Sequence, residues 1–226
     1  MIAAQHFLCR SGVRGIATLL GVSLLVACGK PDATDRSVTA PPATAKPCTI
    51  RHVFPIGALS KGDEQLFSAV EAGDSQRVEQ AIGEGANVNA SGSLKRTPLF
   101  SAAFCDRPAV ASLLIDKSGQ VNVKDANGMS LLHAAVIIGG ADSAKLLIAK
   151  GADINMRDAA GHTPLHVAAA TDQLAMVELL LERGANVSLR DQNGMTAASL
   201  ASANGHKEAE ATIRKWQETH KGTRQK

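Results

Sequence analysis

Residues 157–189 decide the fold, and they read RDAAGHTPLHVAAATDQLAMVELLLERGANVSL. This stretch holds two short helical patterns, each with its own boundary signals. Thr163 is a preferred N-cap residue, and Pro164 suits the first helical position because its missing N–H would be unpaired there anyway. Gly184 supplies the left-handed residue that commonly ends a helix. The stretch therefore predicts a turn, a helix, a tight loop, a second helix and a segment that leads back to the next turn.

Each of the two predicted helices has one apolar side. The first helix presents small residues, with Ala168 and Ala169 beside Leu165, so that neighbouring helices can approach closely. The second helix has a stripe of larger residues at helical spacing: Met176, Val177, Leu180 and Leu181. A unit this small cannot bury both faces by itself, so it must stack on further units.

The same pattern recurs along the chain with a step of 33 residues. Its starts are Thr97, Ser130, Thr163 and Thr196, and one step back reaches a divergent copy at Glu64. The step and the Thr-Pro-Leu-His motif at 163–166 resemble the ankyrin repeat family. The resemblance covers residues 63–218, and it implies an all-α ankyrin-repeat solenoid of about five stacked helix-loop-helix repeats with short hairpin fingers. The expected repeats span 63–90, 91–123, 124–156, 157–189 and 190–218.

Two copies depart from the pattern. The second copy has Gly92 and Lys95 where an aspartate and the turn glycine are expected, so we expect an irregular finger there. The fifth copy has polar residues in place of the leucines of the second helix. Terminal repeats turn a polar face to water, so this copy is expected to be the C-terminal cap. An N-terminal capping segment is expected at 48–62 and a polar tail at 219–226.

The N-terminal segment, residues 1–27, has the pattern of a signal peptide, with Arg10 and Arg14 before an apolar run at 15–26. That run is shorter than the roughly 20 residues that a membrane-spanning helix needs. Residues 25–28, Leu-Val-Ala-Cys, resemble a bacterial lipobox, which implies that Cys28 is lipidated and becomes the mature N-terminus. The alternative is an ordinary signal peptide that leaves Cys28 unmodified. The proline-rich stretch 28–47 is then a disordered tether.

These features predict a protein of the bacterial cell envelope that faces the periplasm and is held to a membrane through Cys28. Gly29 and Lys30 lack the acidic residue associated with inner-membrane retention, which favours the outer membrane. The formal charge of +3 falls by the two units of Arg10 and Arg14 on processing. This balance gives no basis for nucleic-acid binding, which needs a concentrated basic surface. We expect a monomer.

The mature chain would retain two cysteines, Cys48 and Cys105. Thiols in an oxidising compartment are often paired, and Cys105 lies at the predicted end of a first helix, within reach of a passing N-terminal segment. We therefore predict a Cys48–Cys105 disulfide. The alternative is a thiol buried as a small hydrophobic group.

No motif for catalysis, a cofactor or a metal emerges, so an enzyme is not expected. His133 and His166 occupy the slot in which the family's histidine is a structural hydrogen-bonding group. His162 and His166 have a metal-binding spacing, but no acid and no third ligand accompany them. The column Lys124, Arg157 and Arg190 would suit an anion, although solvated charges beside the turn aspartates are the simpler interpretation.

The resemblance places two sets of residues on the concave side of the array. The first set precedes the Thr-Pro-Leu-His slot: Arg96, Met129, His162 and Met195. The second follows the first helix and includes Phe104, Ile137 and Ile138. An exposed apolar patch commonly marks an interaction site, so these residues are the predicted partner-binding surface. The alternative is that they pack against neighbouring repeats.

The leading functional hypothesis is a lipid-anchored periplasmic module that binds an envelope protein or enzyme through its concave surface. A second version of this hypothesis is an immunity protein that neutralises a toxin acting in the periplasm. A different class is an envelope enzyme or an accessory subunit of one, for which no converging nucleophile, base and orienting group is evident. A purely structural spacer would predict a polar concave face.

Overall fold

The computed structural model of the chain describes Cys48 and residues 59–220. The predicted signal peptide, tether and most of the predicted N-terminal capping segment lie outside these residues. The described residues 59–220 belong to one compact unit. In its described part the secondary structure consists of ten α-helices and one short 3₁₀ helix, η1 (Ser93–Lys95), without a strand. The predicted all-α class is confirmed.

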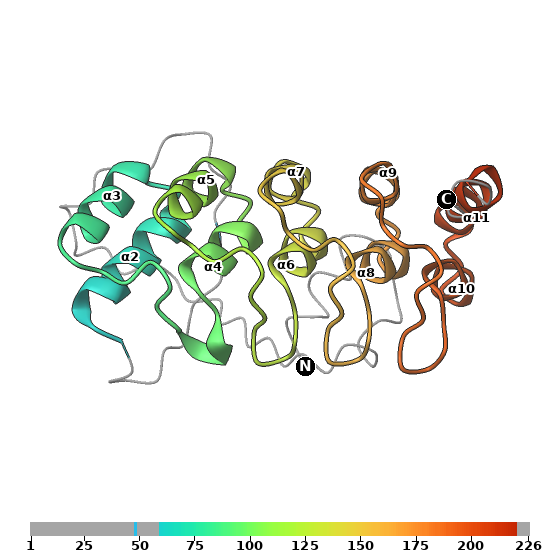
Figure 1. Cartoon of the computed structure of the whole chain (residues 1–226), viewed down its shortest axis with the longest axis horizontal. Coiled ribbons are helices and arrows are strands. Elements are labelled where there is room, and N and C mark those ends of the chain that lie inside the picture. Colours follow the sequence, from blue (N-terminus) through green and yellow to red (C-terminus); the bar gives the residue numbers. More distant parts are fainter. Residues whose placement is uncertain (1–47, 49–58, 221–226) are drawn as a thin grey trace, which may run out of the picture. The chain divides into compact units, whose positions relative to one another are not determined.

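The helices form five pairs, one for each predicted repeat. The first helices of the pairs are α2 (Lys61–Ala72), α4 (Pro98–Phe104), α6 (Leu131–Ile137), α8 (Pro164–Ala170) and α10 (Ala197–Ala203). The second helices are α3 (Ser75–Gly83), α5 (Pro108–Asp116), α7 (Ala141–Ala149), α9 (Leu174–Glu182) and α11 (Lys207–Thr219). Each kind of helix forms its own row, and the segments that join successive pairs project from the first-helix row, away from the second helices (Figure 1). We call these segments the fingers: residues 84–97, 117–130, 150–163 and 183–196.

The core lies between the stacked pairs. Leu132 and Leu165, which follow the helix starts of the third and fourth repeats, are each 1% exposed. Ala168 and Ala169 are fully buried, so α8 packs closely against its neighbours on both sides. Small residues at these positions bring the helices near one another, while leucines fill the space between the rows. The predicted apolar faces are therefore the packed faces.

Local boundary signals set the helix starts and ends. Thr163 is the N-cap of α8, and its Oγ1 lies 2.8 Å from Nδ1 of His166. Thr97 caps α4 by accepting a hydrogen bond from the Phe100 N–H at 3.2 Å. After α9, Gly184 has φ of 85°, the left-handed conformation that favours glycine. These contacts confirm the predicted caps.

The finger of the second repeat is irregular, as its sequence predicts. Gly128, Gly161 and Gly194 hold positive φ at equivalent points of the other fingers, but this finger has Lys95 there, at φ 57°. Leu94 also has φ of 57°, so two consecutive non-glycine residues occupy the left-handed region. Such a conformation costs roughly 1–2 kcal/mol per residue. The finger closes as η1 rather than as the turn seen in the others.

The last repeat has the polar outer face expected of a cap. Ala209 and Ile213 of α11 are fully buried against the array. Lys207 and Arg214, which stand where the fourth repeat has Leu174 and Leu181, are exposed. Helix α11 continues to Thr219, so the expected polar tail begins as helix, and residues 221–226 lie outside the described part.

Candidate protein-binding face

Neighbouring fingers are joined by a repeated asparagine contact. The side-chain amide of Asn122 donates to the Gly151 carbonyl at 3.0 Å and accepts from the Asp153 N–H at 2.8 Å. Asn89, one repeat earlier, makes the same pair of contacts, at 3.1 Å to the Ser118 carbonyl and 2.9 Å from the Gln120 N–H. An amide that both donates and accepts fixes the register of two backbones. The fingers therefore form a continuous surface.

Each regular finger is closed internally by an aspartate. Oδ1 of Asp125 accepts the backbone N–H groups of Asn127 at 2.8 Å and Met129 at 3.0 Å. Asp158 and Asp191 each accept the equivalent pair of N–H groups, at 2.8–2.9 Å. Local bonds of this kind stabilise a turn without secondary structure. Gly92 offers no such acceptor, which explains why its finger takes a different conformation.

His133 and His166 are buried and tie one repeat to the next. Nε2 of His133 lies 3.0 Å from the carbonyl of His162, and a carbonyl only accepts, so Nε2 carries the hydrogen. Nδ1 of His133 then accepts from the Ser130 hydroxyl at 2.7 Å. His166 makes the equivalent contact to the Met195 carbonyl at 3.1 Å. Burial lowers the pKa of both imidazoles. They are neutral structural groups, as their place in the motif implies.

Three of the seven predicted partner-binding residues are buried, and for them the predicted exposure is wrong. Met129 is 5% exposed and belongs to the core. Arg96 is also 5% exposed; its Nε lies 3.2 Å from Oδ2 of Asp125, and its guanidinium carbon lies 4.9 Å from the centre of the Phe100 ring. Arg96 thus reaches along the array to the next repeat instead of out of it.

His162 is the third of these buried residues, at 3% exposed. Its Nδ1 lies 3.3 Å from Oδ2 of Asp158, and its Nε2 lies 3.5 Å from Oδ2 of Asp191 in the next repeat. The hydrogen bond to Asp158 raises the pKa of His162 against the opposing effect of burial, and Asp191 acts in the same direction as Asp158. Burial acts to raise the pKa of Asp158, but the bonds from His162 outweigh it and the pKa is lowered. When His162 is protonated, these contacts form ion pairs within its own repeat and with the next one.

The other four predicted residues, Phe104, Ile137, Ile138 and Met195, are partly exposed. Phe104 and Ile137 also pack against the core, so only part of each side chain reaches solvent. Ile138 is the C-cap residue of α6 and Met195 lies at the end of a finger. The predicted apolar patch is therefore smaller than expected, and Ile138 and Met195 are its accessible members.

Leu94, which the sequence analysis did not single out, adds to this face. It is 46% exposed, and among the described residues it is the one large hydrophobic side chain that the structure leaves exposed. It lies in η1, on the finger of the second repeat. The sequence signal that could have indicated the exposure of Leu94 was the irregular finger predicted from Gly92 and Lys95, because an altered turn changes which side chain faces solvent.

The finger cations Lys124, Arg157 and Arg190 are exposed, but they are not simply solvated charges beside the turn aspartates. Nζ of Lys124 donates to the Arg157 carbonyl at 2.8 Å, and Nη2 of Arg157 donates to the Arg190 carbonyl. Nη1 of Arg190 donates to the Gly194 carbonyl at 2.7 Å. Each long side chain is thus held along the finger surface by backbone contacts.

Both Cys48 and Cys105 are disulfide-bonded in the structure. Cys105 is the C-cap residue of α4 and is 7% exposed. Their pairing with each other stays a prediction, which peptide mapping under non-reducing conditions tests. Cys28 lies outside the described residues.

Within the described residues, no three His, Cys, Asp or Glu side chains are placed to hold a metal ion. His162 and His166, whose spacing suggested a shared metal, have ring centres 6.2 Å apart and are engaged with separate partners. No helix in this part of the chain is long and apolar enough to cross a membrane.

Comparison with known proteins agrees with this architecture. A family model described as ankyrin repeats matches residues 66–158 and 139–212. An ankyrin repeat protein of Rickettsia bellii (strain RML369-C) is 26% identical over 123 residues, 49% of this chain and 18% of that protein. An ankyrin repeat-containing protein of Saccharomyces cerevisiae is 28% identical over 78 residues, 34% of this chain and 15% of that protein. The chain thus spans less than a fifth of the length of these relatives.

Proposed function

Since the chain belongs to the ankyrin repeat family, a family of protein–protein interaction modules, we propose that it binds a protein of the bacterial envelope while a lipid on Cys28 holds it to a membrane. The binding surface is the finger face: the fingers together with the first helices and Ile138, the C-cap residue of α6. The partner is expected to contact it from the periplasm, and the outer membrane is favoured over the inner.

The observation that carries the choice of face is the exposure of Leu94. Leu94 is 46% exposed, so a partner that covers it removes apolar surface from water. This burial favours binding by about 25 cal/mol per Å². Ile138 and Met195 extend the apolar surface to the later repeats, and methionine adapts to varied partner shapes. Interfaces of this kind combine a few apolar anchors with a polar rim, and the finger cations supply the rim.

The anchor is tested separately, by following a fatty-acid probe in cells that express the full-length chain. We expect the probe to label the unmodified sequence and Cys28→Ser to remain an unlabelled, uncleaved precursor, because the thioether needs the thiol. Cys105→Ser is the control, and it should retain the label. A processed, unlabelled and soluble product from the unmodified sequence would refute the lipid anchor but not the binding face.

The face is tested by capture of envelope proteins on the purified domain. Replacement of Leu94 and Ile138 by serine should deplete the captured partner, and circular dichroism should show a nearly unchanged melting curve because neither residue belongs to the core. Replacement of Phe104 or Ile137 would be a poor test, since both pack against the core. Equal capture by the double variant would place the binding surface elsewhere.

A further inference from the structure

We propose that Lys124, Arg157 and Arg190, the cation strip, bind an acidic extended segment of the protein partner. The inference rests on the proposed function and specifies the partner's chemistry. The three residues stand at one position of three successive fingers, 33 residues apart, and all three are exposed. Stacked helices pack about 8–10 Å apart, so the strip presents a positive charge at about that interval.

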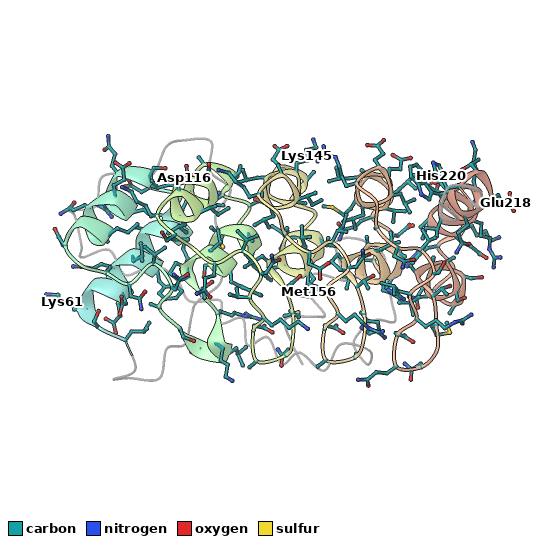
Figure 2. The ribbon with its side chains drawn as sticks, in the orientation of Figure 1. Lys61, Asp116, Lys145, Met156, Glu218 and His220 are labelled. Atoms are coloured by element: carbon teal, nitrogen blue, oxygen red, sulfur yellow. The ribbon has the colours of Figure 1, made fainter. Side chains whose placement is uncertain are left out.

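The charges of the strip are not neutralised by this chain. Among the described residues, none of the three cations lies within ion-pair distance of a carboxylate. Some cations of the second-helix row are paired: Lys145 lies 3.6 Å from Asp142, and Nε of Arg214 lies 2.8 Å from Oε1 of Glu210. Figure 2 shows Asp116 and Lys145 on that row, far from the fingers.

The acids nearest the strip are occupied. Asp125, Asp158 and Asp191 directly follow the three cations in sequence, yet each accepts two backbone N–H groups of its own finger. Asp125 and Asp191 are also buried. Two of these three acids are therefore buried while the cations beside them are exposed, which leaves positive charge on this part of the finger surface.

The strip is also pre-organised. Backbone carbonyls of the fingers hold Lys124 and Arg157, each reaching to the next finger, while Arg190 is held within its own. Lys has three donors and Arg five, so each head group keeps donors free for a carboxylate. A side chain that is already ordered loses less conformational entropy on binding.

An extended protein segment fits this geometry better than a nucleic acid does. A segment in the polyproline II conformation has three residues per turn and advances about 3.1 Å per residue, so carboxylates at every third residue lie on one side of it and match the spacing of the strip. Nucleic acid would need more contacts, because three neutralised phosphates give only weak, salt-sensitive binding. Leu94 lies on the finger before Lys124, so an apolar residue at one end of the segment would meet it.

The test is fluorescence anisotropy with a labelled 12-residue peptide of glycine and serine that carries glutamate at every third position. The full-length chain should bind it more tightly than a peptide of equal composition whose four glutamates are contiguous. The variant Lys124→Gln with Arg157→Gln and Arg190→Gln should weaken binding by about tenfold, since exposed ion pairs contribute a few tenths of a kcal/mol to 1 kcal/mol each. Arg157→Lys with Arg190→Lys keeps the charge and should retain most of the affinity.

The matched control removes the same net charge from the second helices, and its binding should change less than twofold; it is Lys145→Gln with Lys207→Gln and Lys215→Gln. Equal weakening by both triple variants, or by neither, overturns the proposal. If the strip variant melts early, Lys124→Gln alone should still weaken binding two- to threefold.

Two further measurements separate the alternatives. Vesicles of phosphatidylcholine with phosphatidylglycerol that bind through the strip, when the peptide does not, would assign the strip to a membrane and overturn the proposal. A partner that cross-links at Leu94 and Ile138 while the peptide fails to bind leaves the proposed function standing and contradicts the strip alone.

Discussion

At the scale of single residues, His162 shows what spacing within one repeat cannot predict. His162 stands directly before the Thr-Pro-Leu-His motif, and the residues at this position of each repeat were expected to face a partner. In the structure Arg96 and His162 each turn toward an aspartate 29 residues later, Asp125 and Asp191. Side-chain direction there depends on a neighbouring repeat that supplies the carboxylate. A pattern read within one copy contains no information about that contact.

The same pair makes stability depend on pH. The pKa of His162 is raised in the folded state, so its contribution is complete below the unfolded value near 6.5 and is lost as the pH rises through the folded value. The titratable groups that face His162 are Asp158, Asp191, His133 and His166. Of the nearby cations, Lys124 lowers the pKa of His133 and Arg157 lowers the pKa of His166.

The measurement is urea unfolding of the unmodified chain and of His162→Met, which imitates the methionines of the adjoining repeats. The difference in unfolding free energy should be larger at pH 5.5 than at pH 8.5. His133 and His166 are present in both proteins, so the opposite pH dependence that burial gives them cancels in the difference. A difference that does not vary with pH would contradict the ion pair.

At the scale of elements, glycine substitutions in the fingers test whether neighbouring fingers are in contact. Gly128 and Gly194 have nearly the same φ, 75° and 76°, but a Cβ on Gly128 would lie 2.7 Å from the Ala159 backbone N, whereas one on Gly194 would meet nothing within 4 Å. Both alanine variants carry the cost of a left-handed residue, roughly 1–2 kcal/mol. Gly128→Ala should cost about 1–3 kcal/mol more, because it also displaces the next finger. Equal losses in denaturant unfolding would mean that the fingers are not in contact.

The helix interface gives a second prediction at this scale. Leu165 is 1% exposed in a core of small residues, so Leu165→Ala should cost about 2–5 kcal/mol by leaving a cavity. Leu94→Ala is the same chemical change at an exposed position and should stay within about 0.5 kcal/mol. Losses of similar size in the two variants would show that the assigned register is wrong.

The fold at this scale was predictable because its signals are local. The caps at Thr97 and Thr163 and the left-handed Gly184 follow from residue types that favour one backbone conformation, and the irregular finger follows from the loss of the usual aspartate and glycine at positions 92 and 95. The exposure of Leu94 was not predictable, since the shape of an irregular turn is not determined by the absence of its usual residues.

At the scale of the whole molecule, the array exposes Leu94 and the cation strip on its fingers, whereas second-helix cations such as Lys145 and Arg214 are paired with acids. Repeats stabilise one another through neighbouring contacts, so a binding face of this kind needs no pocket. The anchor and tether proposed from residues 1–47 would present that face to partners in the envelope.

The most direct test of the central claim, that the finger face binds a protein partner, is photo-cross-linking in intact cells. A benzophenone amino acid is placed at Leu94 or Ile138 on the finger face, and at Lys145 or Glu178 on the second helices as the control. The account predicts a discrete cross-linked product of the same partner from both finger-face positions and none from the control positions. Products from the second helices alone, or equally from both sides, would contradict it.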